Sequence, residues 1–197
     1  MNEATPPAWR RGVVALLAVP RFVARAFTQQ WHAAPVALVA ATLSTACAAG
    51  FASVAAVWLE GRLGTPLGIA ANSIASAAIA YVSYLAIYYA GMLHVERRAA
   101  RRSDRHEEHA WAMQWRRTAW ADFLLHLPSD LYLLAGIATA QGTLVGTGIA
   151  GPFWAAVCSN LATDVYTTLR EPLYWRAAQH LAGRGAKPAE TPDRRRD

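Results

Sequence analysis

The segment HVERRAARRSDRHEEHAWAMQWRRT, residues 94–118, decides the fold of this chain. It carries seven arginines and four acidic residues, and it separates two long apolar stretches, residues 67–93 and 119–139. Cytoplasmic loops close to membrane helices are enriched in Lys and Arg, whereas short external loops are not. We therefore interpret residues 94–118 as a helical, solvated cytoplasmic loop between two membrane-spanning helices.

The other basic residues repeat this pattern on both sides of the loop. Of the 19 Lys and Arg residues, only Arg62 lies outside three basic segments, which are residues 1–33, 95–118 and 170–197. Two apolar stretches fill each gap between these segments, at residues 34–59, 67–93, 119–139 and 149–169. The pattern predicts an all-α membrane protein with four transmembrane helices, arranged as two hairpins, with both termini in the cytoplasm.

This layout divides the chain into three parts. We expect a basic amphipathic arm at the membrane interface in residues 1–33, a transmembrane domain in residues 34–169, and a basic cytoplasmic tail in residues 170–197. Arginines and a proline interrupt the apolar run of the arm, which argues against a cleaved signal peptide. Pro172 marks the expected end of the fourth helix, and the tail beyond Gly183 has too few apolar residues to order itself.

The composition indicates a membrane protein and limits its partners. Hydrophobic residues make up 54% of the chain and charged residues 16%, against about 25% charged residues in an ordinary soluble domain. The formal net charge of +6 would suit nucleic acid, but the basic residues flank apolar spans, where anionic lipid headgroups are nearer. We therefore expect anionic lipids and no nucleic acid as partners. Cys47 and Cys158 lack metal-ligand spacing and are interpreted as packing residues.

The third span contains three ionisable residues that a lipid-facing helix would avoid, namely Asp122, His126 and Asp130. Their i, i+4, i+8 spacing places all three along one stripe of the helix. Counted from the start of the span, Asp130 lies near the middle of the membrane. An ionised carboxylate costs at least ~2.5 kcal/mol there, so we expect the stripe to face protein or water.

The fourth span runs in the opposite direction and offers a second polar pair, Asn160 and Asp164. Depths counted from the cytoplasmic ends place Asp164 between Asp122 and His126. The same count places Asn160 between His126 and Asp130. We interpret these five residues as a proton or substrate path that is entered from the cytoplasm. The alternative is a hydrogen-bonded cluster that only holds the helices together.

Other polar residues give weaker signals. A metal would suit an Asp-x3-His spacing, but His126 is the single histidine within the predicted spans. His106 and His109 in the loop are three residues apart, whereas zinc proteases of the HExxH type need four. We therefore predict no metal and no cofactor. Arg170 and Glu171 are interpreted as a charged flank, and no catalytic motif suggests an enzyme.

Short motifs in the second half of the chain resemble the small bacterial L-alanine exporter family. They are RRAARR at residues 97–102, Ala121-Asp122 at the start of the third span, and Cys158-Ser159-Asn160 in the fourth. The first span departs from that family, because it is rich in Ala and Ser and has no acidic residue before Glu60. The two tandem hairpins also resemble lipid-linked sugar flippases. Both resemblances imply a small carrier of the bacterial inner membrane.

We therefore predict a small multi-pass inner-membrane carrier, specifically a proton-coupled exporter of a small solute such as an amino acid. Asp130, His126 and Asp164 would handle the coupling proton, and Asn160 and Asp122 would assist them. Four helices make a thin wall around a solute path, so we also expect a homodimer that packs through the Ala- and Ser-rich faces of the first two spans. The alternative is a non-catalytic accessory or assembly subunit of a larger membrane complex.

Overall fold

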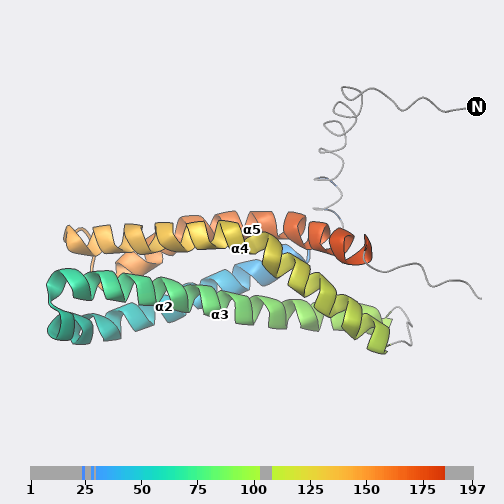
Figure 1. The fold of residues 1–197 in the computed structure, drawn as a ribbon, viewed down its shortest axis with the longest axis horizontal. Helices are drawn as coiled ribbons and strands as arrows, with labels where there is room; N and C mark the ends of the chain where they lie inside the picture. The colour runs from blue at the N-terminus through green and yellow to red at the C-terminus, as the bar shows by residue number, and fades with distance from the viewer. Residues whose placement is uncertain (1–23, 25–27, 29, 103–107, 185–197) are drawn as a thin grey trace, which may run out of the picture.

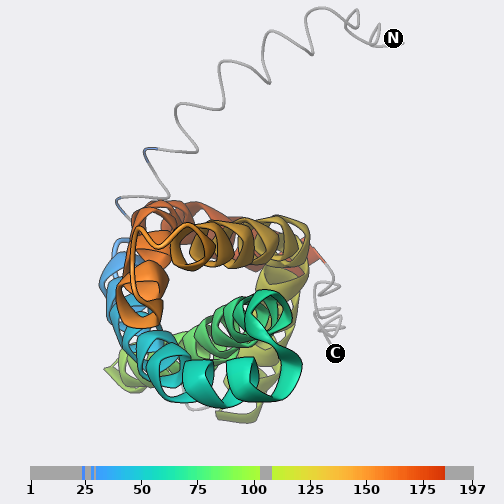
Figure 2. The same ribbon diagram turned by 90° about the vertical axis from the view of Figure 1, so that its left-hand side faces the viewer.

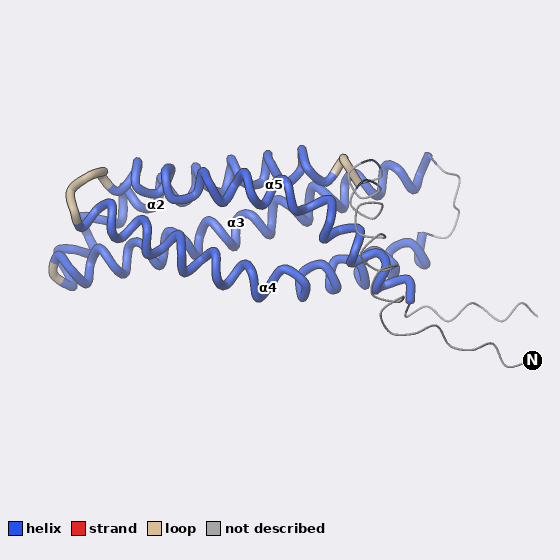
Figure 3. Tube along the Cα trace, turned by 90° about the horizontal axis from the view of Figure 1, so that it is seen from above, coloured by secondary structure: helices blue, strands red, loops and turns tan. Residues whose placement is uncertain are grey.

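The computed structural model describes residues 24, 28, 30–102 and 108–184. These residues form four long helices and no strand, and the helices are α2 (Ala33–Leu63), α3 (Thr65–Arg102), α4 (Glu108–Gly146) and α5 (Pro152–Arg184). The predicted all-α fold is confirmed over this part of the chain (Figure 3). Most of the predicted interfacial arm, the loop residues 103–107 and the tail residues 185–197 lie outside the described residues.

Three of the described helices, α2, α3 and α4, are long and apolar enough to cross a membrane, by length and composition. They contain 31, 38 and 39 residues, which corresponds to roughly 45–60 Å at ~1.5 Å per residue. Because a bilayer hydrocarbon core is ~30 Å thick, each of these helices is longer than a single crossing needs. The 33-residue α5 is also continuous, but it carries more polar residues and does not belong to this group.

The helices form two antiparallel hairpins that pack side by side as a four-helix bundle (Figures 1 and 2). The α2–α3 turn contains Gly64 and the α4–α5 turn contains Gly148, with φ angles of 79° and 72° that favour glycine. α2 contacts α3 and α5, and α4 contacts the same two helices, so α2 and α4 lie diagonally across the bundle. Inward-facing side chains of all four helices therefore meet in its interior.

α2 packs against its neighbours through alanine. Seven of its alanines are at most 1% exposed, and they are Ala33, Ala37, Ala40, Ala41, Ala48, Ala49 and Ala52. Such small side chains let helices approach closely. The close approach of α3 to α2 allows two side chains of α3 to reach backbone carbonyls of α2. Asn72 Nδ2 donates to the carbonyl oxygen of Ala52 at 3.0 Å, and Ser76 Oγ donates to the carbonyl oxygen of Ala48 at 3.3 Å. The buried alanines of α2 are thus used for packing inside the chain.

α5 continues through Pro172 to Arg184, so the sequence-based end of this helix at Pro172 is wrong. Proline has no N–H group and removes one backbone hydrogen bond from a helix interior. Pro172 is fully buried, however, and Glu171 and Trp175 on either side of it are each 1% exposed. Packing along this face outweighs the loss of one bond. The first part of the predicted tail therefore belongs to the bundle.

Candidate functional site

The three ionisable residues of α4 lie inside the bundle. Asp122, His126 and Asp130 are 0%, 3% and 5% exposed, and their spacing of four residues keeps them on one face of the helix. This burial agrees with the expectation that the stripe avoids lipid. Buried charged groups need partners supplied by the protein, and the partners of this stripe come mainly from the middle of α5.

Arg170 and Glu171 supply these partners. They are 5% and 1% exposed, so their interpretation as a charged surface flank is wrong. The guanidinium of Arg170 forms an ion pair with Asp130, and its Nη1 donates to Oγ of Ser129 at 2.8 Å. The ring of Tyr166 lies 5.2 Å below Cζ of Arg170. The Arg170–Asp130 pair is therefore a neutral unit within the bundle.

The sequence did contain a signal for Glu171. Asn160 and Asp164 are four residues apart, and Thr167, Glu171 and Trp175 continue the same helical face. The polar stripe of α5 therefore extends past the predicted end of the fourth span. The assumption that the helix stops at the following proline hid this continuation.

The packing of α4 on α5 also corrects the predicted depths. Asp130 pairs with Arg170, and one turn away His126 stacks on Tyr174 with ring centroids 4.2 Å apart. These two contacts define one antiparallel register. In that register Asp164 lies about six residues, or ~9 Å, beyond Asp130 along α4, instead of on the His126 side of it. The predicted depths were shifted because the fourth helix was ended too early.

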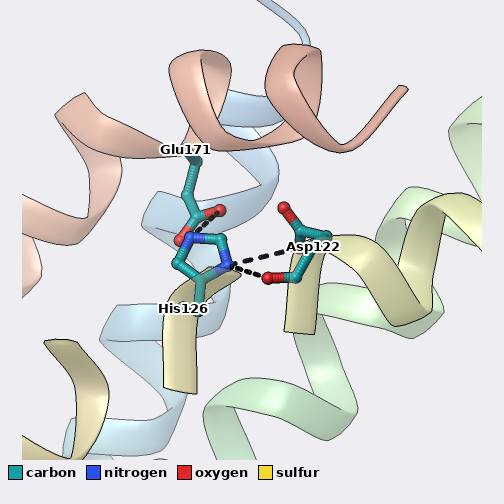
Figure 4. A group of neighbouring side chains, drawn as sticks. All are labelled: Asp122, His126 and Glu171. Carbon is teal, nitrogen blue, oxygen red and sulfur yellow. Dashed lines mark hydrogen bonds and ion pairs between the residues drawn. The ribbon is translucent and has the colours of Figure 1, made fainter. Parts of the chain in front are cut away.

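His126 lies between carboxylates from two helices (Figure 4). Its Nε2 atom is 3.3 Å from Oε2 of Glu171 on α5, and its Nδ1 atom is 3.5 Å from Oδ2 of Asp122 on α4. All three side chains are at most 4% exposed. We call Asp122, His126 and Glu171 the buried triad. It holds two acidic groups and one imidazole, so its negative charge exceeds its positive charge even when the imidazole is protonated.

Two tyrosines of α3 hold the carboxylates of the triad. Tyr84 donates its hydroxyl to Oε1 of Glu171 at 2.7 Å. Tyr89 donates its hydroxyl to Oδ2 of Asp122 at 3.0 Å. Each carboxylate thus has one oxygen bound by a tyrosine, which leaves the second oxygen of each for another partner.

The neighbours of His126 indicate where its ring hydrogen lies. Nδ1 is 2.9 Å from the backbone carbonyl oxygen of Asp122, and a carbonyl oxygen only accepts, so Nδ1 carries a hydrogen. In a neutral ring Nε2 is then an acceptor, and it faces Oε2 of Glu171, which is also an acceptor when ionised. The contact therefore requires a positive species, which is a proton on one of these atoms or a metal ion. One candidate ligand atom from each member of the triad lies within 4.8 Å of the other two.

A cavity of about 50 Å³ lies beside the triad. Side chains from all four helices line it, and those with polar groups include Ser44, Tyr81, Tyr84, Asp130, Asn160, Thr163, Asp164, Thr167 and Arg170. This volume is enough for a few water molecules. Of the five residues predicted to form a path, Asp130, Asn160 and Asp164 line the cavity. Asp122 and His126 belong to the buried triad next to it.

Asp164 differs from Asp130 because it forms no ion pair among the described residues. Its Oδ2 atom accepts a hydrogen bond from the hydroxyl of Thr45 on α2 at 2.8 Å. Asn160 donates to the carbonyl oxygen of Ala156 at 2.8 Å within its own helix, instead of bonding to the stripe on α4. The cavity wall therefore contains one carboxylate without a counter-charge.

Comparison with protein-family models, with curated proteins and with solved structures gives no match for this chain.

Proposed function

We propose that the chain is a small multi-pass carrier of the bacterial inner membrane that exports a small solute, such as an amino acid, by proton coupling. The observation that carries this proposal is the cavity between the four helices, whose wall includes Asp164, a carboxylate with no ion pair among the described residues. An isolated ionised carboxylate at membrane depth is costly. Proton uptake at such a group is therefore favoured, and the group can link a proton to the contents of the cavity.

The proposed topology makes α5 the fourth span and places both chain termini in the cytoplasm. The described basic residues Arg97, Arg98, Arg116 and Arg117 lie at the open end of the hairpins, whereas Arg62 lies in the last turn of α2 at the opposite end. At 33 residues α5 is about 50 Å long. The residues that make it less apolar include Asn160, Arg170 and Glu171, which are buried and do not meet lipid.

We assign the coupling proton to Asp164. Asp130 is already neutralised by Arg170, whereas the hydroxyl of Thr45 is the one hydrogen-bond donor to Asp164 within the described part of the chain. Protonation of Asp164 removes the cost of keeping an unpaired charge away from water. His126 and Asp122, which the sequence also suggested for the proton path, lie behind the cavity in the triad, so we place them outside the solute path.

The cavity offers a site for the cationic group of a solute. The guanidinium of Arg170 is already paired with Asp130, so it supplies no free positive charge for a solute carboxylate. The carboxylate of Asp164 is suited to an ammonium group. A cavity of about 50 Å³ is smaller than an amino acid, so export requires the helices to separate at this point and to open the cavity to one side at a time.

Replacement of Asp164 with Asn tests the proposed coupling. The change keeps the shape and the hydrogen-bonding capacity of the side chain but removes its proton. We expect solute-driven proton flux in vesicles that contain only the purified protein, and we expect the Asp164→Asn variant to lose at least 90% of it, or about tenfold. Flux is measured with a pH-sensitive dye after addition of single amino acids.

The matched control is Glu60→Gln, which also neutralises one carboxylate but lies near the α2–α3 turn, away from the cavity residues. This variant should keep its flux. Equal flux from the Asp164→Asn variant and the wild-type protein would contradict the assignment of the proton.

An accessory subunit of a larger membrane complex is the second candidate. The small size of the cavity favours it, because a closed bundle with an ion-paired interior suits a structural role. This candidate predicts no flux with any solute and a partner that co-purifies at fixed stoichiometry.

A further inference from the structure

Each member of the buried triad has one polar atom bound by the protein and one that is free. Tyr89 binds Oδ2 of Asp122, Tyr84 binds Oε1 of Glu171, and Nδ1 of His126 contacts a backbone carbonyl. Oδ1 of Asp122, Nε2 of His126 and Oε2 of Glu171 form no hydrogen bond, although all three atoms are buried. Metal-binding side chains show this division, because second-shell hydrogen bonds orient the ligands and leave one atom of each for the ion.

The burial of the triad makes the free atoms significant. Buried polar atoms in folded proteins nearly always have a partner, and an unsatisfied one costs about 1–3 kcal/mol. Here three such atoms come from side chains that are 0%, 3% and 1% exposed. They belong to residues whose candidate ligand atoms lie within 4.8 Å of one another. An ion bound by Nε2 of His126 and Oε2 of Glu171, which lie 3.3 Å apart, satisfies these two atoms, and a carboxylate oxygen of Asp122 lies close enough to join them.

The charge balance indicates a divalent ion. Asp122 and Glu171 contribute two negative charges when ionised, and the neutral imidazole of His126 contributes none. The guanidinium of Arg170 pairs with Asp130, and its contact with Glu171 is longer, at 3.9 Å between Nε and Oε1. A divalent cation therefore brings the triad to neutrality, whereas a single proton leaves one negative charge in the interior.

We propose that Asp122, His126 and Glu171 bind one divalent transition-metal ion, with Zn²⁺ as the best fit. One imidazole nitrogen and two carboxylate oxygens suit metals such as Zn²⁺ and Mn²⁺, and three protein ligands leave a fourth position of a tetrahedral zinc site for water. The site joins α4 to α5, and the tyrosines join it to α3. It is independent of the proposed transport function, since it uses neither Asp164 nor the solute cavity.

A surface groove lies next to the triad and offers the ion a route. This groove of about 360 Å³ is lined by Tyr89, Trp115, Arg116, Ala119, Trp120 and Phe123. Tyr89 also holds Asp122 through its hydroxyl. The same side chain therefore contacts the groove and a ligand of the proposed site, and its rotation would connect the two.

The test is Zn²⁺ binding to the purified full-length chain, prepared with an affinity tag that contains no histidine and stripped of metal with a chelator. We expect isothermal titration to give one Zn²⁺ per chain and Co²⁺ to give visible absorption bands with nitrogen and oxygen ligands. The His126→Gln and Glu171→Gln variants should lose this binding. The matched control is His94→Gln, since His94 is an exposed histidine outside the triad, and this variant should bind as the wild type does.

A ligand variant that fails to fold does not prevent the test. Tyr84→Phe removes only the hydroxyl that holds Glu171 and leaves all three ligands in place. Loss of such a second-shell contact should weaken Zn²⁺ binding roughly 10–100-fold. Folding of each protein is checked by circular dichroism and gel filtration before titration.

Two results would overturn the proposal. Folded wild-type protein that binds no Zn²⁺ would show that a proton occupies the contact between His126 and Glu171. Equal binding by the wild type and the folded His126→Gln or Tyr84→Phe variant would show adsorption elsewhere on the protein. A failure of transport is distinguishable from either result, because Asp164→Asn should abolish proton flux and still bind one Zn²⁺ per chain.

Discussion

Arg170 and Asp130 neutralise each other inside the bundle. Arg170 Nε also lies 3.9 Å from Oε1 of Glu171, whereas Asp130 has no second ion-pair partner among the described residues. Removal of one partner from a buried ion pair typically costs 3–5 kcal/mol, because an uncompensated charge remains. Replacement of both partners by apolar residues of similar size costs much less. Loss of one partner should therefore destabilise the fold more than loss of both, and the two residues should be replaced singly and together.

We expect Arg170→Met to lower the free energy of unfolding by about 3–5 kcal/mol. The double variant, Arg170→Met with Asp130→Leu, should recover most of that loss. Both values are measured by denaturant unfolding in detergent micelles. Arg62→Met serves as the control, since Arg62 is exposed and its Cζ lies over the ring of Trp58 at 5.8 Å from the ring centroid, and it should change stability by less than ~1 kcal/mol. Equal instability of the single and double variants would show that charge neutralisation is not the role of Arg170.

Residue spacing was sufficient to place Asp122, His126 and Asp130 on one inward-facing stripe. It was not sufficient to identify their partners. A partner across a helix interface depends on the register between the two helices, and hydropathy defines only where each helix meets the membrane. Arg170 and Glu171 were missed for that reason. The tyrosines at 84 and 89 were missed because aromatic residues in a span pack far more often than they bind carboxylates.

At the scale of the helix, the α2–α3 hairpin depends on one close approach between backbones. Gly68 is buried near the start of α3, and a Cβ atom added there would lie 2.5 Å from the Cα atom of Glu60. Backbone atoms cannot move aside as a flexible side chain can. This position therefore requires glycine for space, in contrast to Gly64, which has a positive φ angle.

Gly68→Ala should lower the free energy of unfolding by about 1–3 kcal/mol, as overpacking does. Gly50→Ala is the matched control, because Gly50 is an exposed glycine of α2 with no atom near its added Cβ. That change should be neutral or stabilising, since alanine favours helices by up to ~1 kcal/mol over glycine. The comparison is made by thermal unfolding of both variants in the same detergent, and a Gly68→Ala variant as stable as the Gly50→Ala variant would contradict the close approach.

Helix existence could be predicted from the apolar stretches, but helix ends could not. The described helices are longer than the predicted spans, because residues such as Glu171 and Trp175 continue to pack after the apolar sequence ends. Tertiary contacts extend a helix wherever they outweigh the local cost of a proline. Hydropathy carries no information about those contacts.

At the scale of the whole molecule, the outer surface is consistent with a lipid environment. Large apolar side chains are exposed on every helix, and examples are Val54, Val82, Leu131 and Leu161. The distribution of Arg and Lys along the sequence predicts how the chain is oriented across the membrane. Arg98 is expected on the cytoplasmic side and Arg62 on the opposite side. We propose that any second copy of the chain binds through this outer surface.

Cysteine labelling tests the proposed orientation. Cys47 and Cys158 are first replaced with Ala, and a single cysteine is introduced by Gly61→Cys or by Arg98→Cys. We expect a membrane-impermeant maleimide to label the Gly61→Cys variant in intact cells and spheroplasts. The Arg98→Cys variant should be labelled only after the membrane is permeabilised. The reverse pattern would place the termini outside the cytoplasm.

The alanine face of α2 has a mechanical consequence. Where α2 meets α5, the contact includes Ala49, Ala52 and Ala156, and the Thr45–Asp164 hydrogen bond crosses the same seam. Side chains this small form no ridges that interlock, so this stretch of the α2–α5 contact offers little steric resistance to sliding. The hydrogen bond between Thr45 and Asp164 resists such a movement, as does the Gln30–Gln179 hydrogen bond near the start of α2. The strength of the first bond depends on whether Asp164 carries a proton.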